Sequence, residues 1–594
     1  MHRYKRIASC AIALILVAAA LIAAGQTAPT QPTRQSTGAR DWWKNAVIYE
    51  IYPRSFQDSN GDGIGDLNGI TQRLDYLKDL GVDAIWLTPC YPSPQVDFGY
   101  DISDYENIDP QYGTLQDFDR LVAEAGKRYI RVLMDMVMNH SSDKHKWFLD
   151  SRSSASADNP YRDWYMWRDG KGQTATDKGA PPNNWQSYFG HSAWQWDEKT
   201  RQYYYHKFYI QQPDLNWNNP RVHEAFKEII SFWLKRGVGG FRFDAINTLF
   251  EDSNLTDEGI VKDKDGNPRI NAYGDPVLDD TKTSNLPGLH SVVQEMRAHM
   301  DTFSAGNFPG TRVLVGETYM PNIAELAKMY GPSDKPAFHL PMDTQVGFIN
   351  KLDVAQFRAK LTDVETRIGG NTPLLLFDNH DNPRIEARYG DGVHDTEIQR
   401  VIATVLFLSR GAALFYYGDE IGMKTTPPTR KEDVKDPIGV TGWPKEKGRD
   451  GERTPMQWDA SENAGFSKAA PWLPVPPSAD TINVQTEKAN PDSLLEWYRN
   501  LIRLKKTNPA LARGNNVMLD TSNSKVLSWL RQAPGAPAVV VAVNFTSDPQ
   551  TVNLSLSGSS GKTKTLLKSP GAADPASLDQ IALAPFGIYV GEVQ

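Results

Sequence analysis

The sequence predicts an α/β protein: a TIM-type (β/α)8 barrel with an irregular subdomain inserted after the third strand, followed by a C-terminal antiparallel β-sandwich domain. Short apolar runs alternate with amphipathic helical stretches, one segment breaks that alternation, and the end of the chain changes to a period of two. At 594 residues the chain has room for about three structural pieces. We therefore assign the barrel to residues 41–138 and 216–511, the inserted domain B to 139–215, and the β domain to 512–594.

Eight apolar runs are expected to form the barrel strands, and helical stretches lie between most of them. The runs are residues 46–52, 84–88, 130–137, 240–244, 312–316, 337–341, 373–377 and 412–416. The first helices are expected over residues 70–80 and 115–128. In a closed parallel barrel, catalytic residues come from the C-terminal ends of several strands, so those ends are the first place to search for a site.

Two segments depart from this regularity. Residues 139–215 contain no strand–helix unit and are dense in Trp, Tyr, Asp and Gly, so we expect an irregular insertion that borders the site. After the last long helix, at 491–511, the chain shows short alternating runs. Examples are residues 526–530, 538–544 and 588–590, which predict antiparallel strands.

The N-terminus has the features of a targeting segment. Basic residues at positions 2–6 precede an apolar stretch at 7–24 and small residues at 23–25, which predicts a signal peptide over residues 1–25. The following residues, 26–40, are expected to be a flexible linker. A secreted or periplasmic protein follows, with an uncleaved membrane anchor as the alternative because the apolar stretch is near the shortest spanning length.

The composition limits the classes of molecule that the protein is expected to bind. Only Cys90 remains after the signal, so no internal disulfide can form, and we expect this residue to be buried. The net charge of −8 is mild and mixed in sign, which gives no basic surface for nucleic acid. A neutral substrate fits this balance, and the 16 Trp and 24 Tyr include rings suited to sugar faces, although most are expected to be packing residues. Nothing in the sequence favours a particular oligomeric state.

Three carboxylates, Asp244, Glu317 and Asp381, each follow an apolar run, in GGFRFDA, VLVGETY and LLLFDNHD. A carboxylate beside an apolar run risks costly burial unless chemistry uses it. Glycosidic bond cleavage needs one carboxyl group to protonate the leaving oxygen and a second at the anomeric carbon. A lone acid of this kind is as readily a cap or a salt bridge. Two further signatures, DMVMNH at 135–140 and QPDLNW at 212–217, complete an ordered set that argues against that reading.

This ordered set resembles glycoside hydrolase family 13, the α-amylase superfamily, in its α-glucosidase and oligo-1,6-glucosidase branch, from about Trp42 to the end. The resemblance implies that Asp244 is the nucleophile, Glu317 the general acid and base, and Asp381 the carboxylate that holds the sugar hydroxyls. Three more residues match those that line the glucose subsite: His140, Arg242 and His380. Arg242 shares a strand face with Asp244 and is expected to keep it ionised, while Glu317 holds a proton.

The resemblance also implies a pocket closed behind one glucose. In DFGYD, Asp97 matches an acid that grips the outer sugar hydroxyls, and Tyr100 matches a ring that stacks on the sugar. Arg453, in RTPMQW, matches the arginine that pairs with that acid in exo-acting members. Three residues of the insertion match walls of the subsite: Phe189, Phe208 and Gln212. Plain packing is the alternative for the two phenylalanines.

The segment DSNGDGIGD, residues 58–66, carries oxygen ligands at alternate positions. They are Asp58, Asn60, Asp62, the Ile64 carbonyl and Asp66. This spacing suits a hard cation, as in the first part of an EF-hand loop, although Gly69 stands where the final glutamate of an EF-hand would be. The resemblance supports a structural Ca2+, with an Asp-rich turn as the alternative. No organic cofactor is expected.

Substrate identity rests on one position. Family members that prefer α-1,6 bonds often carry Val after the nucleophile, whereas this chain has Ala245. We therefore favour maltose and malto-oligosaccharides, in an exo-acting retaining α-glucosidase. A methyl-scale change shifts preference by only about 10 to 200-fold, so α-1,6 bonds, trehalose and sucrose stay open. Glucosyl transfer or isomerisation also stays open, because an acceptor other than water can intercept a covalent intermediate. An inactive binding module is the remaining alternative, and the three acids argue against it.

Overall fold

The structure is a computed structural model that describes residues 41–303, 310–556, 559 and 561–594. The predicted signal peptide, 1–25, and linker, 26–40, lie outside the described residues. Across the described ranges, no helix is both long and apolar enough to pass through a bilayer. Cys90 is buried, as predicted.

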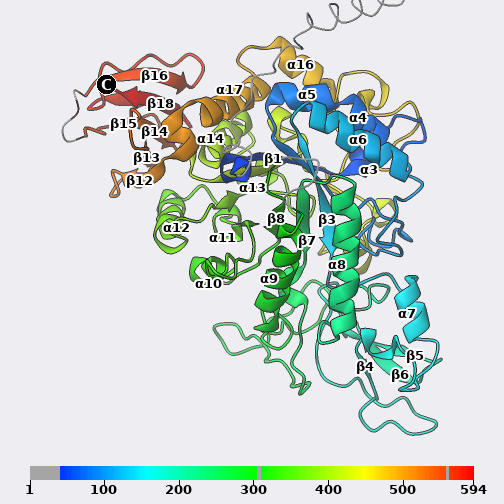
Figure 1. Cartoon of the computed structure of the whole chain (residues 1–594). Helices are drawn as coiled ribbons and strands as arrows, with labels where there is room; N and C mark the ends of the chain where they lie inside the picture. Colours follow the sequence, from blue (N-terminus) through cyan, green and yellow to red (C-terminus); the bar gives the residue numbers. More distant parts are fainter. Residues whose placement is uncertain (1–40, 304–309, 557–558, 560) are drawn as a thin grey trace, which may run out of the picture.

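Eight parallel strands form a nearly closed barrel in the middle of the molecule (Figure 1). They are β1 (Val47–Ile51), β2 (Ala84–Leu87), β3 (Arg131–Val137), β7 (Gly240–Asp244), β8 (Val313–Gly316), β9 (Leu340–Pro341), β10 (Leu374–Leu375) and β11 (Ala412–Tyr416). β1 pairs with both β2 and β11, and a parallel bridge between Met342 and Leu374 lies where β9 faces β10. The predicted TIM-barrel class is confirmed, and each of the eight predicted runs contains a strand.

Two strands are less than half as long as their apolar runs. β9 and β10 have two residues each, although the runs at 337–341 and 373–377 have five. Pro341 lies in β9 and Pro373 precedes β10, and a proline has no N–H to donate to a neighbouring strand. The barrel is therefore held least regularly between these two strands.

The inward-facing side chains change from apolar to charged along the barrel axis. A cluster of buried apolar side chains, including Ile48, Leu133 and Val315, fills the interior. Because side chains alternate across a strand, Glu50, Asp135 and Glu317 project to the same side two residues further on. The barrel is thus apolar inside and charged at the C-terminal ends of its strands.

Helices surround the strands (Figure 1). They are α3 (Pro53–Phe56), α4 (Leu67–Gln72), α5 (Leu74–Leu80), α6 (Leu115–Lys127), α8 (Pro220–Lys235), α9 (Gly288–Asp301), α10 (Ile323–Lys328), α11 (Thr344–Gly347), α12 (Val354–Arg367), α13 (Ile385–Tyr389), α14 (Asp395–Leu408), α15 (Pro437–Gly442), α16 (Val484–Ala489), α17 (Leu494–Thr507) and α18 (Pro509–Arg513). Short 3-10 helices are η1 (Trp42–Asn45), η2 (Arg162–Trp164), η3 (Ile246–Thr248), η4 (Asp419–Ile421), η5 (Lys431–Asp433), η6 (Glu462–Gly465) and η7 (Pro477–Asp480).

Local signals set several of these helix limits. Thr114 begins α6 with a capping box, in which its side chain and that of Asp117 each accept the other residue's N–H. The long helix expected over 491–511 is divided into α17 and α18, because Asn508 caps the second helix and Pro509 starts it.

The segment inserted after β3 has more order than predicted. It contains α7 (Lys146–Ser151) and a three-stranded antiparallel sheet of β4 (Trp167–Arg168), β5 (Trp194–Asp197) and β6 (Gln202–Tyr205). A small aromatic core, including Trp185 and Tyr205, holds it together. Isolated bridges join His140 to Asp214 and Tyr165 to Leu215, so the two ends of the segment meet beside the barrel.

The C-terminal part is antiparallel, as predicted. Its main sheet has the order β12-β13-β14-β18-β16, with a β15–β17 pair beside it. The strands are β12 (Asn515–Leu519), β13 (Val526–Gln532), β14 (Val539–Asn544), β15 (Gln550–Val552), β16 (Thr563–Lys568), β17 (Ile581–Leu583) and β18 (Ile588–Val593). Apolar side chains of both sheets share one core cluster, among them Val540, Val552 and Ile581. The predicted limits of the individual domains stay predictions.

Candidate active site

Arg242 of β7 is the centre of a buried charge cluster at the C-terminal end of the barrel. Its Nη1 donates to both carboxylate oxygens of Asp135 at 3.0 Å each and to Asp244 Oδ1 at 2.5 Å. Its Nη2 lies 2.7 Å from Glu317 Oε1. One guanidinium therefore contacts three carboxylates, which leaves negative charge in excess.

The predicted nucleophile and acid stand on neighbouring strands. Asp244 ends β7 and Glu317 directly follows β8, and Phe243 pairs with Gly316 between the two strands. The N–H of Ala245 donates to Glu317 Oε2 at 2.8 Å, which ties the residue after one acid to the other acid. The shared contacts with Arg242 and this hydrogen bond bring both carboxyl groups into one site.

Ala245 has a backbone conformation that residues other than glycine rarely adopt. Its φ is 45° and its ψ is 35°, in the left-handed region. Residues held in this region store about 1–3 kcal/mol of strain and concentrate at functional sites. Here the strained turn aims the Ala245 N–H at Glu317 and starts η3.

Asp381 lies beside two arginines and one histidine. Both Arg449 Nη1 and Arg453 Nη2 donate to its Oδ1 at 2.8 Å, and His380 Nε2 is 3.2 Å from Oδ2. Burial opposes ionisation of Asp381, but His380 and the two arginines outweigh burial and hold the pKa of this carboxyl well below its usual range. Asp381 is therefore a permanent acceptor for hydroxyl groups at neutral pH.

Asp97 closes the far side of the site, and here one prediction is wrong. The arginine that pairs with Asp97 is Arg449, whose Nη2 donates to Oδ1 at 2.8 Å, and not Arg453. Arg453 is fully buried and is held by the His380 carbonyl and by Asp381. Its Nε and Nη2 are used there, whereas Arg449, four residues earlier, donates to both Asp97 and Asp381.

The other predicted subsite residues gather around Asp97 and His380. Gln212 Nε2 is 3.1 Å from both Asp97 Oδ2 and His140 Nε2. Tyr100 stacks on His380 with ring centres 5.3 Å apart, and its hydroxyl lies 2.7 Å from His380 Nε2. The structure thus brings these side chains into one polar wall.

Phe189 and Phe208 form the apolar part of the wall. Phe208 lies 5.0 Å from His140 and 5.7 Å from Phe189, measured between ring centres. The Arg449 guanidinium lies 5.6 Å from the Phe189 ring centre. Both phenylalanines therefore lie beside the polar groups of the pocket. They pack against each other and also form part of its wall.

Three residues of the site were missed by sequence reasoning. Glu50, inside β1, lies 2.6 Å from His380 Nδ1. Asp436 accepts hydrogen bonds from Arg449 Nε at 2.8 Å and Nη2 at 2.9 Å. Arg449 stands four residues before Arg453 of RTPMQW, and no feature of the sequence distinguishes the two arginines. No local sequence pattern indicates that Glu50 contacts His380, because a single acid within an apolar strand occurs for many structural reasons.

The acidities differ from the expectation in one respect. Burial raises the pKa of Asp244, Arg242 opposes this shift, and Glu317 and Asp135 add to it. We expected Arg242 to keep Asp244 ionised. The physical reason for the difference is that one guanidinium is divided among three carboxylates, so its field does not compensate Asp244 fully.

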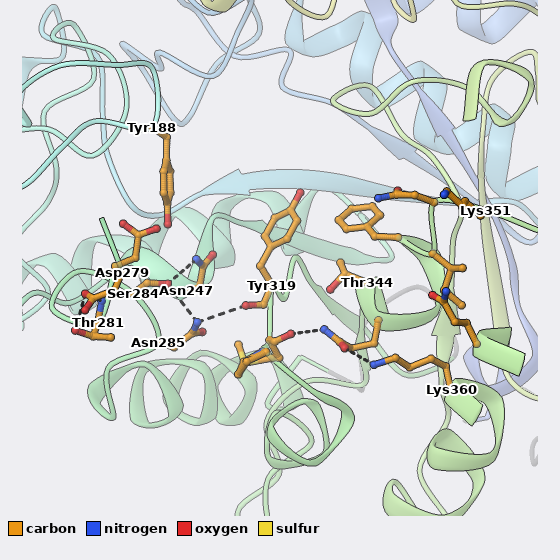
Figure 2. Close-up of a pocket in the computed structure, with 18 residues that line it drawn as sticks. Tyr188, Asn247, Asp279, Thr281, Ser284, Asn285, Tyr319, Thr344, Lys351 and Lys360 are labelled. Carbon is orange, nitrogen blue, oxygen red and sulfur yellow. Dashed lines mark hydrogen bonds between the residues drawn. The ribbon is translucent and has the colours of Figure 1, made fainter. Parts of the chain in front are cut away.

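A cavity of about 930 Å³ adjoins this site (Figure 2). None of the three acids lines it, but its wall includes Tyr319, whose hydroxyl donates to Glu317 Oε1 at 3.3 Å. Figure 2 shows Tyr319 in the middle of the wall, with Asn285 on one side and Lys351 and Lys360 on the other. The cavity therefore lies on the side of the predicted proton donor.

The Asp-rich loop wraps its backbone around Asp58. Asp58 Oδ1 accepts the N–H groups of Asn60 and Gly61 at 2.9 and 2.7 Å, and Oδ2 accepts that of Gly63 at 2.9 Å. Gly61 and Gly63 have φ values of 84° and 89°, which permit this tight course. The donor set of carboxylate, amide and carbonyl oxygens fits a hard cation.

Within the described residues, however, no group of three or more His, Cys, Asp or Glu side chains is gathered as a metal site. Asp66 accepts hydrogen bonds from the Ser59 and Gly69 N–H groups, at 2.8 Å each, and caps α4. The geometry of the loop by itself thus also fits an Asp-rich turn, and the Ca2+ assignment stays a prediction.

A TIM barrel with an inserted subdomain, a C-terminal antiparallel sheet and paired carboxylates at its strand ends defines a glycoside hydrolase. Residues 50–514 match the alpha-amylase family, described as the alpha amylase catalytic domain. The chain belongs to glycoside hydrolase family 13, in its α-glucosidase and oligo-1,6-glucosidase branch.

Relatives cover nearly the whole chain. A probable alpha-glucosidase of Rhizobium meliloti is 41% identical and covers 87% of this chain and 91% of its own length. An oligo-1,6-glucosidase of Parageobacillus thermoglucosidasius is 38% identical, over 93% of this chain and 99% of its own. Among solved structures, trehalulose synthase of Pseudomonas mesoacidophila superposes with a TM-score of 0.82 at 36% identity, covering 93% of this chain and 99% of that one.

Proposed function

We propose that this glycoside hydrolase is a secreted, exo-acting, retaining α-glucosidase that releases terminal glucose from short α-glucosides, with maltose and malto-oligosaccharides favoured. The observation that carries the proposal is the bridge of Arg449 between Asp97 and Asp381. None of these three side chains lines the cavity beside Glu317, so we infer that a sugar chain entering through the cavity meets a closed end at this bridge.

The closed end selects the exo mode of action. Asp97, Asp381 and Arg449 offer two carboxylates and a bidentate donor, which together match the hydroxyl groups of one terminal glucose. A second sugar beyond that glucose would have to displace the ion pairs at 2.8 Å that join these side chains. The leaving group instead extends into the cavity past Tyr319.

In the first chemical step, Asp244 attacks the anomeric carbon while Glu317, in its acid form, protonates the glycosidic oxygen. The bond between the anomeric carbon and that oxygen breaks, the leaving sugar departs as an alcohol, and glucose is esterified to Asp244. A retaining mechanism requires the two carboxyl groups about 5–5.5 Å apart. Their contacts with two nitrogens of one guanidinium support such a separation.

In the second step, Glu317 as carboxylate takes a proton from water, and the resulting nucleophile attacks the same anomeric carbon. The ester bond breaks, Asp244 leaves as a carboxylate, and glucose is released with its original configuration. Asp381 remains anionic throughout and accepts hydrogen bonds from the ring hydroxyls. Arg242 stabilises the carboxylate of Asp244 in each step in which it carries charge.

Linkage preference is proposed from Ala245. A small side chain beside the nucleophile leaves room for the angle of an α-1,4 aglycone. The relatives named above include an oligo-1,6-glucosidase and a trehalulose synthase, so hydrolysis of α-1,6 bonds and glucosyl transfer form the second candidate. The size of the cavity favours keeping transfer as a candidate, because 930 Å³ accommodates an acceptor sugar as well as water.

One assay separates these candidates. The purified mature chain is incubated separately with maltose, isomaltose, trehalose and sucrose, and glucose and new disaccharides are followed over time. We expect glucose from maltose at the highest rate. Faster turnover of isomaltose would transfer the assignment to an α-1,6-glucosidase, and accumulation of new disaccharides would indicate transfer. No turnover of any substrate by a folded chain would favour a binding module.

The proposal extends to the Asp-rich loop and to the N-terminus. We infer a structural Ca2+ held by Asp58, Asn60, Asp62, Asp66 and the Ile64 carbonyl, supported by the spacing of hard oxygen ligands and by the turn at Gly61 and Gly63. The ion would stiffen the loop after β1. Secretion is supported by the basic and apolar composition of residues 1–25.

A further inference from the structure

A loop of residues 259–279 crosses from the barrel to the inserted subdomain. Isolated backbone bridges hold it together, between Ile260 and Leu278 and between Ile270 and Pro276. At its tip, Asn271 Oδ1 accepts the N–H of Tyr273 at 3.0 Å and that of Asp275 at 2.9 Å. The loop therefore presents Tyr273 from a compact turn.

The Tyr273 ring lies against two glycines that belong to different elements. A carbon added to Gly190, in the inserted subdomain, would lie 2.6 Å from Tyr273 Cγ, and one added to Gly442, at the end of α15, would lie 3.2 Å from Cε1. The first distance is far too short for a real contact. The ring thus fills the space that a side chain on Gly190 would need, and it also closes on Gly442.

Two hydrogen bonds join the same three elements. The His191 N–H of the inserted subdomain donates to Asp275 Oδ2 at 2.8 Å. The hydroxyls of Tyr209, also in the inserted subdomain, and Thr441 of α15 are 3.1 Å apart. The loop, the inserted subdomain and α15 are therefore docked together, with Tyr273 between them.

The opposite end of α15 holds the arginine of the glucose pocket. Asp436 caps α15 and accepts hydrogen bonds from Arg449 Nε at 2.8 Å and Nη2 at 2.9 Å. Arg449 in turn donates to Asp97 and Asp381 at 2.8 Å each. This helix has six residues, so a displacement at Gly442 is transmitted to Asp436 over less than two turns.

We propose that Tyr273 is a positioning residue for the glucose pocket, because it wedges α15 against the inserted subdomain and so fixes Arg449 between Asp97 and Asp381. The inference rests on the proposed function of that pocket. The ring, not the hydroxyl, carries the role. Loss of the ring weakens recognition of the terminal glucose by the same factor whatever the leaving group.

The test compares Tyr273→Ala and Tyr273→Leu with Tyr273→Phe, and with the control Ile270→Ala on the exposed surface of the same loop. We measure kcat/KM for maltose and for a nitrophenyl α-glucoside, and the affinity for glucose by calorimetry, with thermal melting as the folding check. For the alanine variant we expect kcat/KM to fall about 10 to 100-fold, equally for both substrates, because small misplacements of positioning groups have effects of this size. Its glucose affinity falls with it, while Phe and the control stay within about twofold of the wild type.

Three results would overturn the inference: wild-type kcat/KM and glucose affinity in the folded alanine and leucine variants, a loss confined to one leaving group, or an equal loss in Ile270→Ala. If the alanine variant does not fold, the leucine variant carries the same comparison. The calorimetry separates this inference from the proposed function. A wild type that binds glucose but hydrolyses neither substrate would contradict the function alone, and a weaker glucose affinity in Tyr273→Ala would still support the positioning role.

Discussion

At the residue scale, the electrostatics of the site depend on Arg242 and on the carboxylates that share it. Asp135, Asp244 and Glu317 all contact its guanidinium. A single cation among three buried acids favours retention of a proton within the group. Glu317 has two further partners, the Ala245 N–H and the Tyr319 hydroxyl, which distinguish its surroundings from those of Asp244.

The pH dependence of catalysis follows from this cluster. Burial raises the pKa of Asp244 in the free enzyme, despite Arg242. In the proposed mechanism Asp244 attacks only as a carboxylate, so activity is lost as the pH falls through that raised pKa. We expect the acidic limb of kcat/KM against pH to lie above the ordinary aspartate value of about 4. A limb at or below that value would show that Arg242 compensates Asp244 fully.

Arg449 gives a second prediction at this scale. Arg449→Lys keeps the charge but loses the fork that reaches Asp97, Asp381 and Asp436 together. We expect kcat/KM for maltose to fall about 10 to 100-fold, since a buried hydrogen bond to a charged group is worth about 1.5–3 kcal/mol. Steady-state kinetics measures the effect.

Arg430→Lys is the matched control for Arg449→Lys, because Arg430 makes an exposed pair with Asp433. It should leave kcat/KM unchanged, as exposed ion pairs contribute little. Equal kinetics in the two lysine variants would remove Arg449 from the pocket.

Sequence reasoning located most residues of the site but not all their contacts. Asp244, Glu317 and Asp381 stand at the ends of apolar runs, and the ordered set of motifs around them was needed to separate them from caps and salt bridges. The choice between Arg449 and Arg453 was not available from the sequence, because both lie in one segment and only the course of the loop after α15 decides which arginine faces Asp97.

At the element scale, apolar runs predicted the strands well and their lengths less well. β7 and β11 have the predicted limits, whereas β9 and β10 are reduced to two residues beside Pro341 and Pro373. Among the C-terminal strands outside the runs named from the sequence, the edge strands β12 and β16 are only partly buried and do not alternate cleanly. The alternation of apolar and polar residues identifies strands that have one buried face. These two edge strands have no fully buried face, so they lack that pattern.

The loop after β1 carries a prediction about metal removal. If Asp58, Asp62 and Asp66 hold Ca2+, a chelator removes a ligand that binds only the folded state. We expect the melting temperature to fall by a few degrees, since saturation at about 100 times the Kd contributes about 2.7 kcal/mol. Elemental analysis should find about one calcium ion per chain. Asp62→Asn should weaken both effects, whereas melting unaffected by chelator and a chain without calcium would indicate an Asp-rich turn.

At the scale of the whole molecule, buried cations join the C-terminal domain to the barrel. Arg531 of β13 is buried and donates to the carbonyls of Leu408 at 2.6 Å, Leu511 at 2.9 Å and Gly514 at 2.8 Å. Leu408 ends α14, where the helix dipole favours a cation. The C-terminal domain therefore supplies the cap of a barrel helix.

Replacing Arg531 by methionine should loosen this junction. Three buried carbonyls would lose the Arg531 donor, and that of Leu408 would keep the longer hydrogen bond from Trp529 Nε1 at 3.3 Å. Each buried group left unsatisfied costs about 1–3 kcal/mol. We expect a melting temperature lower by several degrees and kcat/KM for maltose within about twofold of the wild type, because Arg531 makes no contact with the site. Calorimetric melting measures the change in stability. Lys525→Met, an exposed substitution in the same domain, is the control. An unchanged melting temperature would contradict the proposed cap.

The most direct test of the central claim is the anomeric form of the first glucose released from maltotriose, followed by proton NMR early in the reaction. With Asp244 and Glu317 at one anomeric bond in a closed pocket, a double displacement releases α-glucose together with maltose. We predict that signal before mutarotation, and its absence in Asp244→Asn. Release of β-glucose would contradict the role of Asp244 as nucleophile.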